Sequence, residues 1–585
     1  MKLHMPSAST RFVTGAVALA SLSGFCFGYD TGSVGSLTTM DSFYAEFGHI
    51  SETLRGVVVS MILIPSAISG IFAGSISDKL SRKRAIALGA AIFAVGQAVS
   101  CCTFRYIGVL VLGRLIAGTG EGIFLGTLSV YVSEISPKHT RGFMLVLTQS
   151  FICLGVSCGF FTTYGTSNLQ PSSISWRLPF AINASVALFI AFTAPFLPYS
   201  PRWLLMHNRR SEAEAVLAKL CGDGPVAMQE RRELLAAGDA ALADKGAERS
   251  KRAGFKRMWQ KEYRWRTVLG TCINTFQMLS GIDFILFYAP LLYEQAGMSS
   301  ETAKLASGIT GILLILSTFV TAAFIQKVGR RPIFLWGGVS TATCLMVIGI
   351  LYASGAAYAS GKWAVIVFIE LYAFVFGVSW ASVVRLYANE IQPSATRAAA
   401  GSFGQGCNQA VNFAVALTGP VFLQASSVGP YFFYGAWTVL ATVFAVFAMP
   451  ETRGKSLEEI DQMFTQTSIP LAVALPSFMT SSSSPLANAR LAVSDKVREH
   501  RQRRTSRSQS QSLGGEEAGI NLRQRRPSRR RSSAGAGSGI SPARPVGDTI
   551  DEYEEDGFKE DPRAAFRREM MAVGTLGKGD SAIDE

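Results

Sequence analysis

Residues 134–141 read Glu-Ile-Ser-Pro-Lys-His-Thr-Arg, and residues 390–397 read Glu-Ile-Gln-Pro-Ser-Ala-Thr-Arg. The two segments share their Glu, Pro, Thr and Arg and lie 390 − 134 = 256 residues apart. A second pair, residues 74–83 and 322–331, places basic residues at an offset of 330 − 82 = 248. Two offsets that agree within eight residues predict a chain built from two related halves, which is typical of transporters made of repeats.

Apolar residues dominate the chain: 49% of its 585 residues are hydrophobic and 16% are charged, against about 25% charged in soluble domains. A membrane-spanning helix needs about 20 mostly apolar residues. Six such runs precede residue 200 and six follow residue 265. They are residues 12–36, 54–77, 84–103, 107–132, 143–164, 177–198, 267–295, 302–326, 333–355, 363–388, 399–423 and 430–449. The sequence therefore predicts an all-α membrane protein with twelve transmembrane helices in two pseudo-symmetric six-helix bundles.

Lys and Arg gather in the loops of one side only. Basic residues fill the turn at 79–84, the segment at 202–257 and the turn at 327–331, whereas the alternate loops at 49–52 and 167–175 have almost none. Short loops rich in Lys and Arg face the cytosol. Both termini are therefore predicted to be cytosolic. The net charge of +14 is mostly explained by these helix ends and does not indicate a nucleic-acid partner.

The composition changes after residue 465. Between residues 490 and 544 there are 14 Lys and Arg against 4 Asp and Glu, and between 545 and 585 there are 5 against 12. Such a segment cannot bury a core. Arg503 to Ser506 and Arg525 to Ser528 are candidate sites for cytosolic kinases or other partners. The predicted domains are a cytosolic segment 1–11, a bundle 12–198, cytosolic linker helices 199–265, a bundle 266–450, an end motif 451–465 and a disordered tail 466–585.

No pattern in the sequence indicates an enzyme. The nine cysteines show no spacing typical of zinc ligands or of a disulfide framework. We find no nucleotide-binding loop and no nucleophile paired with a base, so we expect neither a metal nor a cofactor.

Eight motifs in order make the chain resemble a sugar porter of the major facilitator superfamily over about residues 15–465. They are residues 28–32, 74–83, 113–122, 134–142, 198–204, 277–288, 329–332 and 450–454. The resemblance implies transport of a hexose or pentose by alternating access across a lipid bilayer, through a central site between the two bundles. It also implies Asp30 as a proton carrier that pairs with Arg114. Ionisable residues inside membrane helices are costly and therefore point to function.

The resemblance further implies a network of charged residues at the cytosolic helix ends, which would hold that side shut. Its members are Asp78, Arg82, Glu134, Arg141, Arg330, Arg331, Glu390, Arg397 and Glu451. Sugar recognition in the family uses amides and aromatic rings, because an amide offers both a donor and an acceptor to neighbouring hydroxyl groups. Residues at the matching positions are Gln149, Gln277, Asp283, Tyr288, Arg385, Asn408 and Asn412.

Several positions depart from the family pattern. Residues 381–385 read Ala-Ser-Val-Val-Arg where the family has Gly-Pro-x-x-Trp, and Gln409 replaces a second Trp. We expect Arg385 to form an ion pair with Asp283, which itself replaces an Asn. Glu121 lies seven residues after Arg114, on the same face of the helix, and has no family counterpart; pairing or pore lining would explain it.

The most direct interpretation is a sugar/proton symporter in the plasma membrane. Three alternatives remain open at this point: a uniporter of the same sugars, a transporter that binds a sugar acid or a quinate-like substrate through Arg385, and a non-transporting sugar sensor that signals through its tail.

Overall fold

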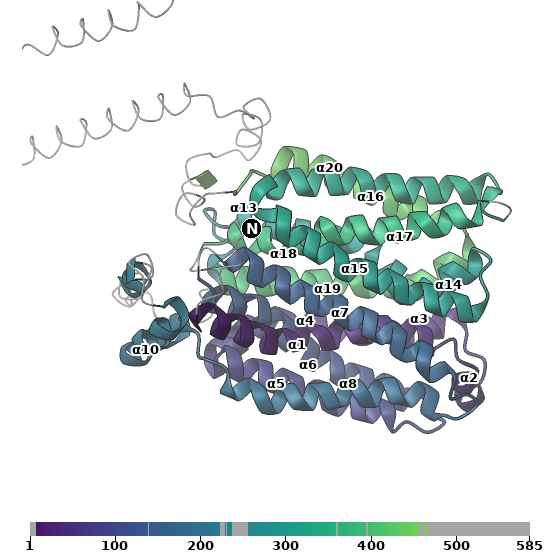
Figure 1. Cartoon of the computed structure of the whole chain (residues 1–585), viewed down its shortest axis with the longest axis horizontal. Helices are drawn as coiled ribbons and strands as arrows, with labels where there is room; N and C mark the ends of the chain where they lie inside the picture. The colour runs from purple at the N-terminus through teal and green to yellow at the C-terminus, as the bar shows by residue number, and fades with distance from the viewer. Residues whose placement is uncertain are drawn as a thin grey trace, which may run out of the picture. The chain divides into compact units, whose positions relative to one another are not determined.

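The computed structural model describes residues 8–137, 140–222, 228–229, 231–236, 255–358, 361–393, 396–453, 460 and 463–464, and every regular element among them is a helix. The helices lie alongside one another, and α10 (Arg210–Cys221) stands at one end (Figure 1). The candidate phosphorylation sites and the end of the last motif fall outside the described residues. The predicted domain boundaries stay a prediction, although the first helix begins at Ala8, inside the predicted terminal segment.

The first half supplies six membrane-length segments. Its elements are α1 (Ala8–Leu37), α2 (Asp41–Phe47), α3 (Glu52–Ser60), α4 (Leu63–Leu80), α5 (Arg82–Cys101), α6 (Ile107–Ile135), α7 (Arg141–Ser167), α8 (Ile174–Thr193) and η1 (Ala194–Phe196). The short α9 (Pro201–Met206) and α10 then follow.

The second half repeats this order. Its elements are α13 (Arg264–Leu279), α14 (Ile282–Gln295), α15 (Ser300–Val328), α16 (Arg330–Ala353), η3 (Ala356–Tyr358), α17 (Lys362–Val378), α18 (Trp380–Glu390), α19 (Arg397–Ala425) and α20 (Gly429–Ala448). All twelve predicted runs are therefore helical.

Eleven segments of the described residues are long and apolar enough to cross a membrane. The twelfth, α19, has 29 residues but is not among them, because amide and hydroxyl side chains such as Asn408, Gln409 and Asn412 dilute its apolar content. These side chains are buried, and α19 packs against α3, α4 and α13. It is an interior helix, which explains why its sequence is polar.

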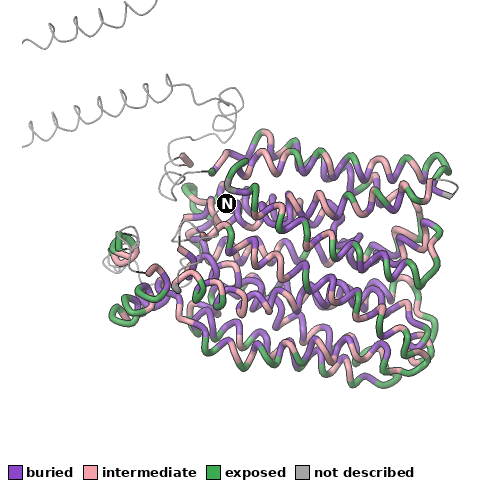
Figure 2. Tube along the Cα trace, viewed as in Figure 1, coloured by how far each residue is buried: buried purple, intermediate pink, exposed green. Residues whose placement is uncertain are grey.

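The outer surface of the bundle is apolar. Large side chains such as Phe72, Phe192 and Trp336 are more than half exposed, and Figure 2 shows exposed positions along the outer sides of the helices and buried ones between them. Apolar side chains on the outside are what a lipid environment favours.

Two helices of the second half are interrupted near their middle. Gly281 adopts left-handed backbone angles (φ 85°, ψ 14°) between α13 and α14, and Ser379 (φ −107°, ψ −80°) separates α17 from α18. In transporters, breaks of this kind occur where irregular backbone lines a cavity.

The two halves meet where α7 packs against α15, α3 and α4 pack against α19, and α1 packs against α14, with a smaller contact between α6 and α19. Packing at α1 and α14 is very close, since Gly35 lies directly against the backbone of Phe287. This contact is at the end of the bundle near α2, on the right of Figure 1. We call the other end, where α5 and α16 begin with Arg82 and Arg330, the charged end.

Candidate functional site

Two adjoining cavities lie between the halves, with about 630 and 570 Å³ of empty space including their mouths. The charged-end cavity is lined by residues of α6, α7, α13, α18 and α19, including Ser129, Leu145 and Gln405. The inner cavity is lined by residues of α1, α7, α13, α14, α15, α17, α18 and α19, beside both helix breaks. Gln149 and Arg385 line both cavities. The amide and guanidinium side chains in both linings suit a small polar ligand.

The amides predicted from the sequence gather at this site. Gln149, Gln277 and Asn408 line the inner cavity. Gln277 donates to the carbonyl of Trp380 at 3.0 Å, and Asn408 donates to the carbonyl of Asn274 at 2.8 Å. The Oε1 atoms of Gln149 and Gln277 are buried and have no partner among the described residues. Buried polar atoms normally find partners, so these acceptors are available to hydroxyl groups in the cavity.

Asn412 is fully buried one turn further along α19. Neither its amide oxygen nor its amide nitrogen has a hydrogen-bond partner within the described part of the chain. Asp283 also leaves its Oδ2 atom without a partner there. Asn412 lines neither cavity. Among the described residues, the unsatisfied polar atoms of the inner cavity are therefore those of Gln149 from the first half and of Gln277 and Asp283 from the second.

Asp30 and Arg114 form a buried ion pair inside the first half. Nη1 of Arg114 donates to both carboxylate oxygens of Asp30, at 2.6 and 2.8 Å. Gln97 also donates to Asp30, at 3.0 Å. The rest of the guanidinium group donates to the carbonyls of Val58 and Val59, at 3.1 and 2.8 Å. Arg114 is fully buried, so α1, α3, α5 and α6 are tied together by one charge-assisted cluster.

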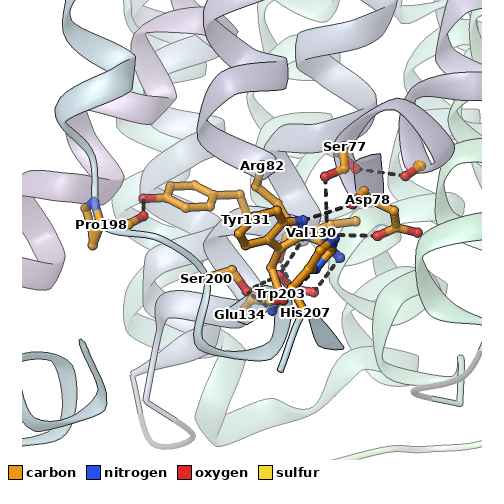
Figure 3. Close-up of polar contacts among 12 residues, drawn as sticks. Ser77, Asp78, Arg82, Val130, Tyr131, Glu134, Pro198, Ser200, Trp203 and His207 are labelled. Carbon is orange, nitrogen blue, oxygen red and sulfur yellow. Dashed lines mark hydrogen bonds and ion pairs between the residues drawn. The ribbon is translucent and has the colours of Figure 1, made fainter. Parts of the chain in front are cut away.

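At the charged end, three motifs of the first half meet in one cluster (Figure 3). Arg82 pairs with Glu134 at 3.0 Å and with Asp78 at 2.8 Å. Residues 198–204 pack onto this pair: Ser200 donates to Glu134 at 2.5 Å, and the Trp203 indole donates to the carbonyl of Asp78 at 2.9 Å. The ends of α4, α5, α6 and α9 are thereby fastened to one another.

The second half repeats the arrangement. Arg330 pairs with Glu390 at 2.9 Å, and Thr452 donates to the other Glu390 oxygen at 2.8 Å. Glu451 accepts from the backbone N–H groups of Arg330 and Arg331, both at 3.0 Å. A carboxylate at the start of a helix is stabilised by these unpaired N–H groups and the helix dipole.

Two further members of the predicted network donate to backbone carbonyls of the second half. Arg331 donates to the carbonyl of Val446 at 2.7 Å, and Arg397 donates to that of Gln392 at 3.0 Å. Arg141 is the first residue of α7. The ion pairs Arg82–Glu134 and Arg330–Glu390 thus each join helices of one half. They lie at matching positions of the two repeated halves.

Comparison with known proteins places the chain in a family. The family described as "Sugar (and other) transporter" matches residues 16–464. The chain belongs to this family. "Sugar transport protein MST8" of Oryza sativa subsp. japonica is 30% identical over 485 residues, which is 79% of this chain and 93% of that protein. "Sugar transport protein 7" of Arabidopsis thaliana is 28% identical over 478 residues, covering 78% and 91%.

A solved structure of the proton:xylose symporter XylE bound to 6-bromo-6-deoxy-D-glucose matches with a TM-score of 0.68 and 26% identity, covering 78% of this chain and all of the other. These findings confirm the predicted family, the major facilitator fold, and the prediction of a transporter rather than an enzyme. Asp283 and Arg385, which depart from the pattern of the family, both line the inner cavity.

The predicted ion pair between Asp283 and Arg385 is not formed as a direct contact in this conformation, although the two groups interact electrostatically. Both side chains line the inner cavity, but no salt bridge joins them in the described structure. Asp283 lies in the first turn of α14, directly after the break at Gly281, and Arg385 lies in α18 and is half-buried. An Arg that faces a cavity open to water does not require a counter-ion, which explains why the pair need not form.

Tyr288 also differs from its expected role. It lines neither cavity, and its hydroxyl donates to the carbonyl of Ala416 at 2.5 Å. Tyr288 itself has non-helical backbone angles within α14. The side chain therefore connects α14 to α19 and does not face the site.

Two contacts at the site were not expected from the sequence. Gln97 lies in an apolar run, and only its polarity marked it before the structure placed it on Asp30. Glu121 is fully buried and accepts from Gln409 of the second half at 2.9 Å and from Ser66 at 3.0 Å. The absence of a family counterpart was the available signal for Glu121, but the sequence did not indicate its partners.

Proposed function

We propose that this protein transports a monosaccharide, a hexose or pentose, together with protons, by alternating access to the amide-lined cavities. The observation that carries the proposal is the buried Asp30–Arg114 pair beside those cavities. The similarity to XylE, a proton:xylose symporter, supports the same class of substrate and coupling.

The chemistry of the pair explains how a proton could be coupled to movement. Protonation of Asp30 would remove its negative charge and weaken its bonds with Arg114, which are strong because they are charge-assisted. Asp30 lies on α1, and α1 also packs against α14 of the other half. A change at Asp30 would therefore reach the interface between the halves.

The charged end supports a gating role for Asp78, Arg82, Glu134, Arg141, Arg330, Arg331, Glu390, Arg397 and Glu451. In the conformation described, the pairs Arg82–Glu134 and Arg330–Glu390 each stay within one half. We propose that bonds between the halves form at this end when the site opens at the other end, and that each cluster moves as one body.

We also propose that both termini are cytosolic and that the protein resides in the plasma membrane. The excess of Lys and Arg in the loops of the charged end supports this orientation. Tags at either terminus should be accessible to antibody only after the cells are permeabilised. Staining of a terminal tag on intact cells would contradict the orientation.

The function is tested with the purified protein in liposomes. We expect radiolabelled glucose or xylose to accumulate when the outside is acidic, and to stop accumulating when a protonophore is added. Uptake that only equilibrates, whether or not the protonophore is present, would establish a uniporter. No uptake of any sugar, combined with sugar-induced thermal stabilisation, would establish a sensor.

Gln277 provides a test of the binding site. Replacing Gln277 with Ala removes an acceptor that faces the inner cavity, and a lost neutral hydrogen bond is worth about 0.5–1.5 kcal/mol. We expect the KM for sugar to rise about two- to tenfold in uptake assays, with little change in maximal rate.

Gln392 is a matched control for Gln277. Its amide also donates to a backbone carbonyl, that of Arg266 at 2.9 Å, and its Oε1 is also buried without a partner. It lines neither cavity. Equal KM values for the Gln277→Ala and Gln392→Ala proteins would contradict a role for Gln277 in binding the sugar.

A further inference from the structure

A second buried carboxyl group lies between the halves of the molecule. Glu121 of α6 is fully buried. Its Oε1 atom accepts from Gln409 at 2.9 Å and from Ser66 at 3.0 Å, while its Oε2 atom has no partner among the described residues. Gln409 also donates to Ser66 at 3.1 Å, so the three side chains form a closed triangle.

The backbone directs Glu121 toward the second half. The next residue, Gly122, lies so close to α4 that a Cβ there would be 2.2 Å from the carbonyl oxygen of Ser66. This close approach brings α6 against α4, and α4 packs against α19. Glu121 can therefore reach across the interface to Gln409, although its own helix belongs to the first half.

The surroundings of Glu121 do not favour an ionised carboxylate. Four ionisable groups interact electrostatically with Glu121. They are Cys26 and Asp30 from α1, Arg114 from α6 and Asp283 from α14. Arg114, the only cation of the four, already donates to both oxygens of Asp30. Glu121 itself forms no salt bridge within the described residues.

The energies decide between the two protonation states. A buried ion without compensation costs several kcal/mol, whereas a neutral carboxyl group with one unpaired hydroxyl costs about 1–3 kcal/mol. A neutral group also fits the geometry, because Oε1 with two donors has the pattern of a carbonyl oxygen. These costs favour the protonated form of Glu121 in this conformation.

We propose that Glu121 is a proton-binding site linked to the docking of the two halves, separate from the site at Asp30. Glu121 holds its proton while Gln409 is docked against it, and releases the proton when α19 rocks away and water reaches the carboxyl group. The proposal rests on the alternating-access part of the proposed function and does not depend on coupling through Asp30.

Linkage gives the size of the effect. If Glu121 binds one proton in the docked state and releases it in the separated state, the ratio of docked to separated molecules changes by up to tenfold per pH unit. Acid favours the docked state, and alkali favours the separated state.

The experiment measures the distance between the halves directly. Leu80 at the end of α4 and Val328 at the end of α15 are exposed at the charged end, so they can carry a fluorescent donor and acceptor as non-canonical amino acids, with the native cysteines unchanged. The full-length protein in liposomes is titrated with pH, without sugar and without a gradient. We expect the Glu121→Gln protein to stay docked in alkali. The ratio of its docked to its separated state should depend less steeply on pH than that of the wild type, by up to tenfold per pH unit.

Glu370 supplies the matched control. It accepts at one oxygen from Tyr293 at 2.8 Å and from Thr310 at 3.0 Å, and its other oxygen has no partner among the described residues. All three residues belong to the second half, so Glu370→Gln should keep the wild-type pH response. A Glu121→Gln protein that also keeps it would overturn the proposal.

A second variant guards against a folding defect in the first. Gln409→Lys places a cation against Glu121, so the Glu121 carboxylate would be ionised in the docked state as well as in the separated state. Glu121 would then no longer contribute to the pH response of the distance. A wild-type response in Gln409→Lys would overturn the proposal.

The Asp30→Asn protein is measured in parallel. Loss of sugar accumulation in that variant tests symport, whereas the distance titration tests Glu121. A distance that never changes would contradict alternating access itself.

Discussion

Replacing Asp30 with Asn should abolish the accumulation of sugar while sugar exchange continues. Asn has nearly the shape of a protonated Asp but cannot release a proton. One charge moved through 100 mV is worth about 2.3 kcal/mol, which corresponds to roughly 50-fold accumulation. The wild-type protein should reach accumulation of this order in liposomes with an imposed potential, and Asp30→Asn should stop at equal concentrations.

We expect this variant to fold, because Arg114 keeps other hydrogen-bond acceptors. Arg114 would lose its carboxylate partner but would keep the carbonyls of Val58 and Val59, and Gln97 could still donate to the oxygen of Asn. Exchange of labelled for unlabelled sugar should therefore persist. Glu370→Gln is the control, because it neutralises another partly buried carboxyl group, whose partners Tyr293 and Thr310 lie in the second half. Accumulation by Asp30→Asn above equilibrium would show that the proton is carried elsewhere.

The sequence predicted the halves, the helices and the position of the site for clear physical reasons. A membrane helix must be apolar over a fixed length, so the runs could be found by composition. Charged residues inside such runs are rare enough to stand out, and Asp30 and Arg114 indeed form a pair. The charged motifs around Arg82 and Arg330 were identifiable because they repeat, and each forms an ion pair at an equivalent place.

Contacts across the interface could not be predicted in the same way. The partners of Asp283 and Arg385 depend on where α14 and α18 begin, and the breaks at Gly281 and Ser379 fix those starts. Glu121 and Gln409 are 288 residues apart, and their contact depends on the close packing of α6 against α4. Sequence spacing describes one helix at a time, so the relation between helices had to come from the structure.

Replacing Gly35 with Ala should stop transport almost completely. A Cβ on Gly35 would lie 1.6 Å from the carbonyl oxygen of Phe287, and backbone atoms cannot move aside as a side chain can. Overpacking costs about 1–3 kcal/mol or more, and the upper value corresponds to a shift on the order of 100-fold between two states. The variant should favour the conformation that is open at the end near α2. The conformation described above, in which α1 packs against α14 at that end, should become rare.

Gly15 makes the comparison specific to this contact. It lies on the same helix, α1, and a Cβ there would meet no atom within 4 Å. Both variants add one methyl group to α1 and change helix propensity equally, so only the contact with α14 distinguishes them. We expect Gly15→Ala to take up sugar like the wild type, and Gly35→Ala to bind sugar in calorimetry but to fail in both uptake and exchange. Equal uptake by the two variants would mean that closure of α1 against α14 is not a step of the transport cycle.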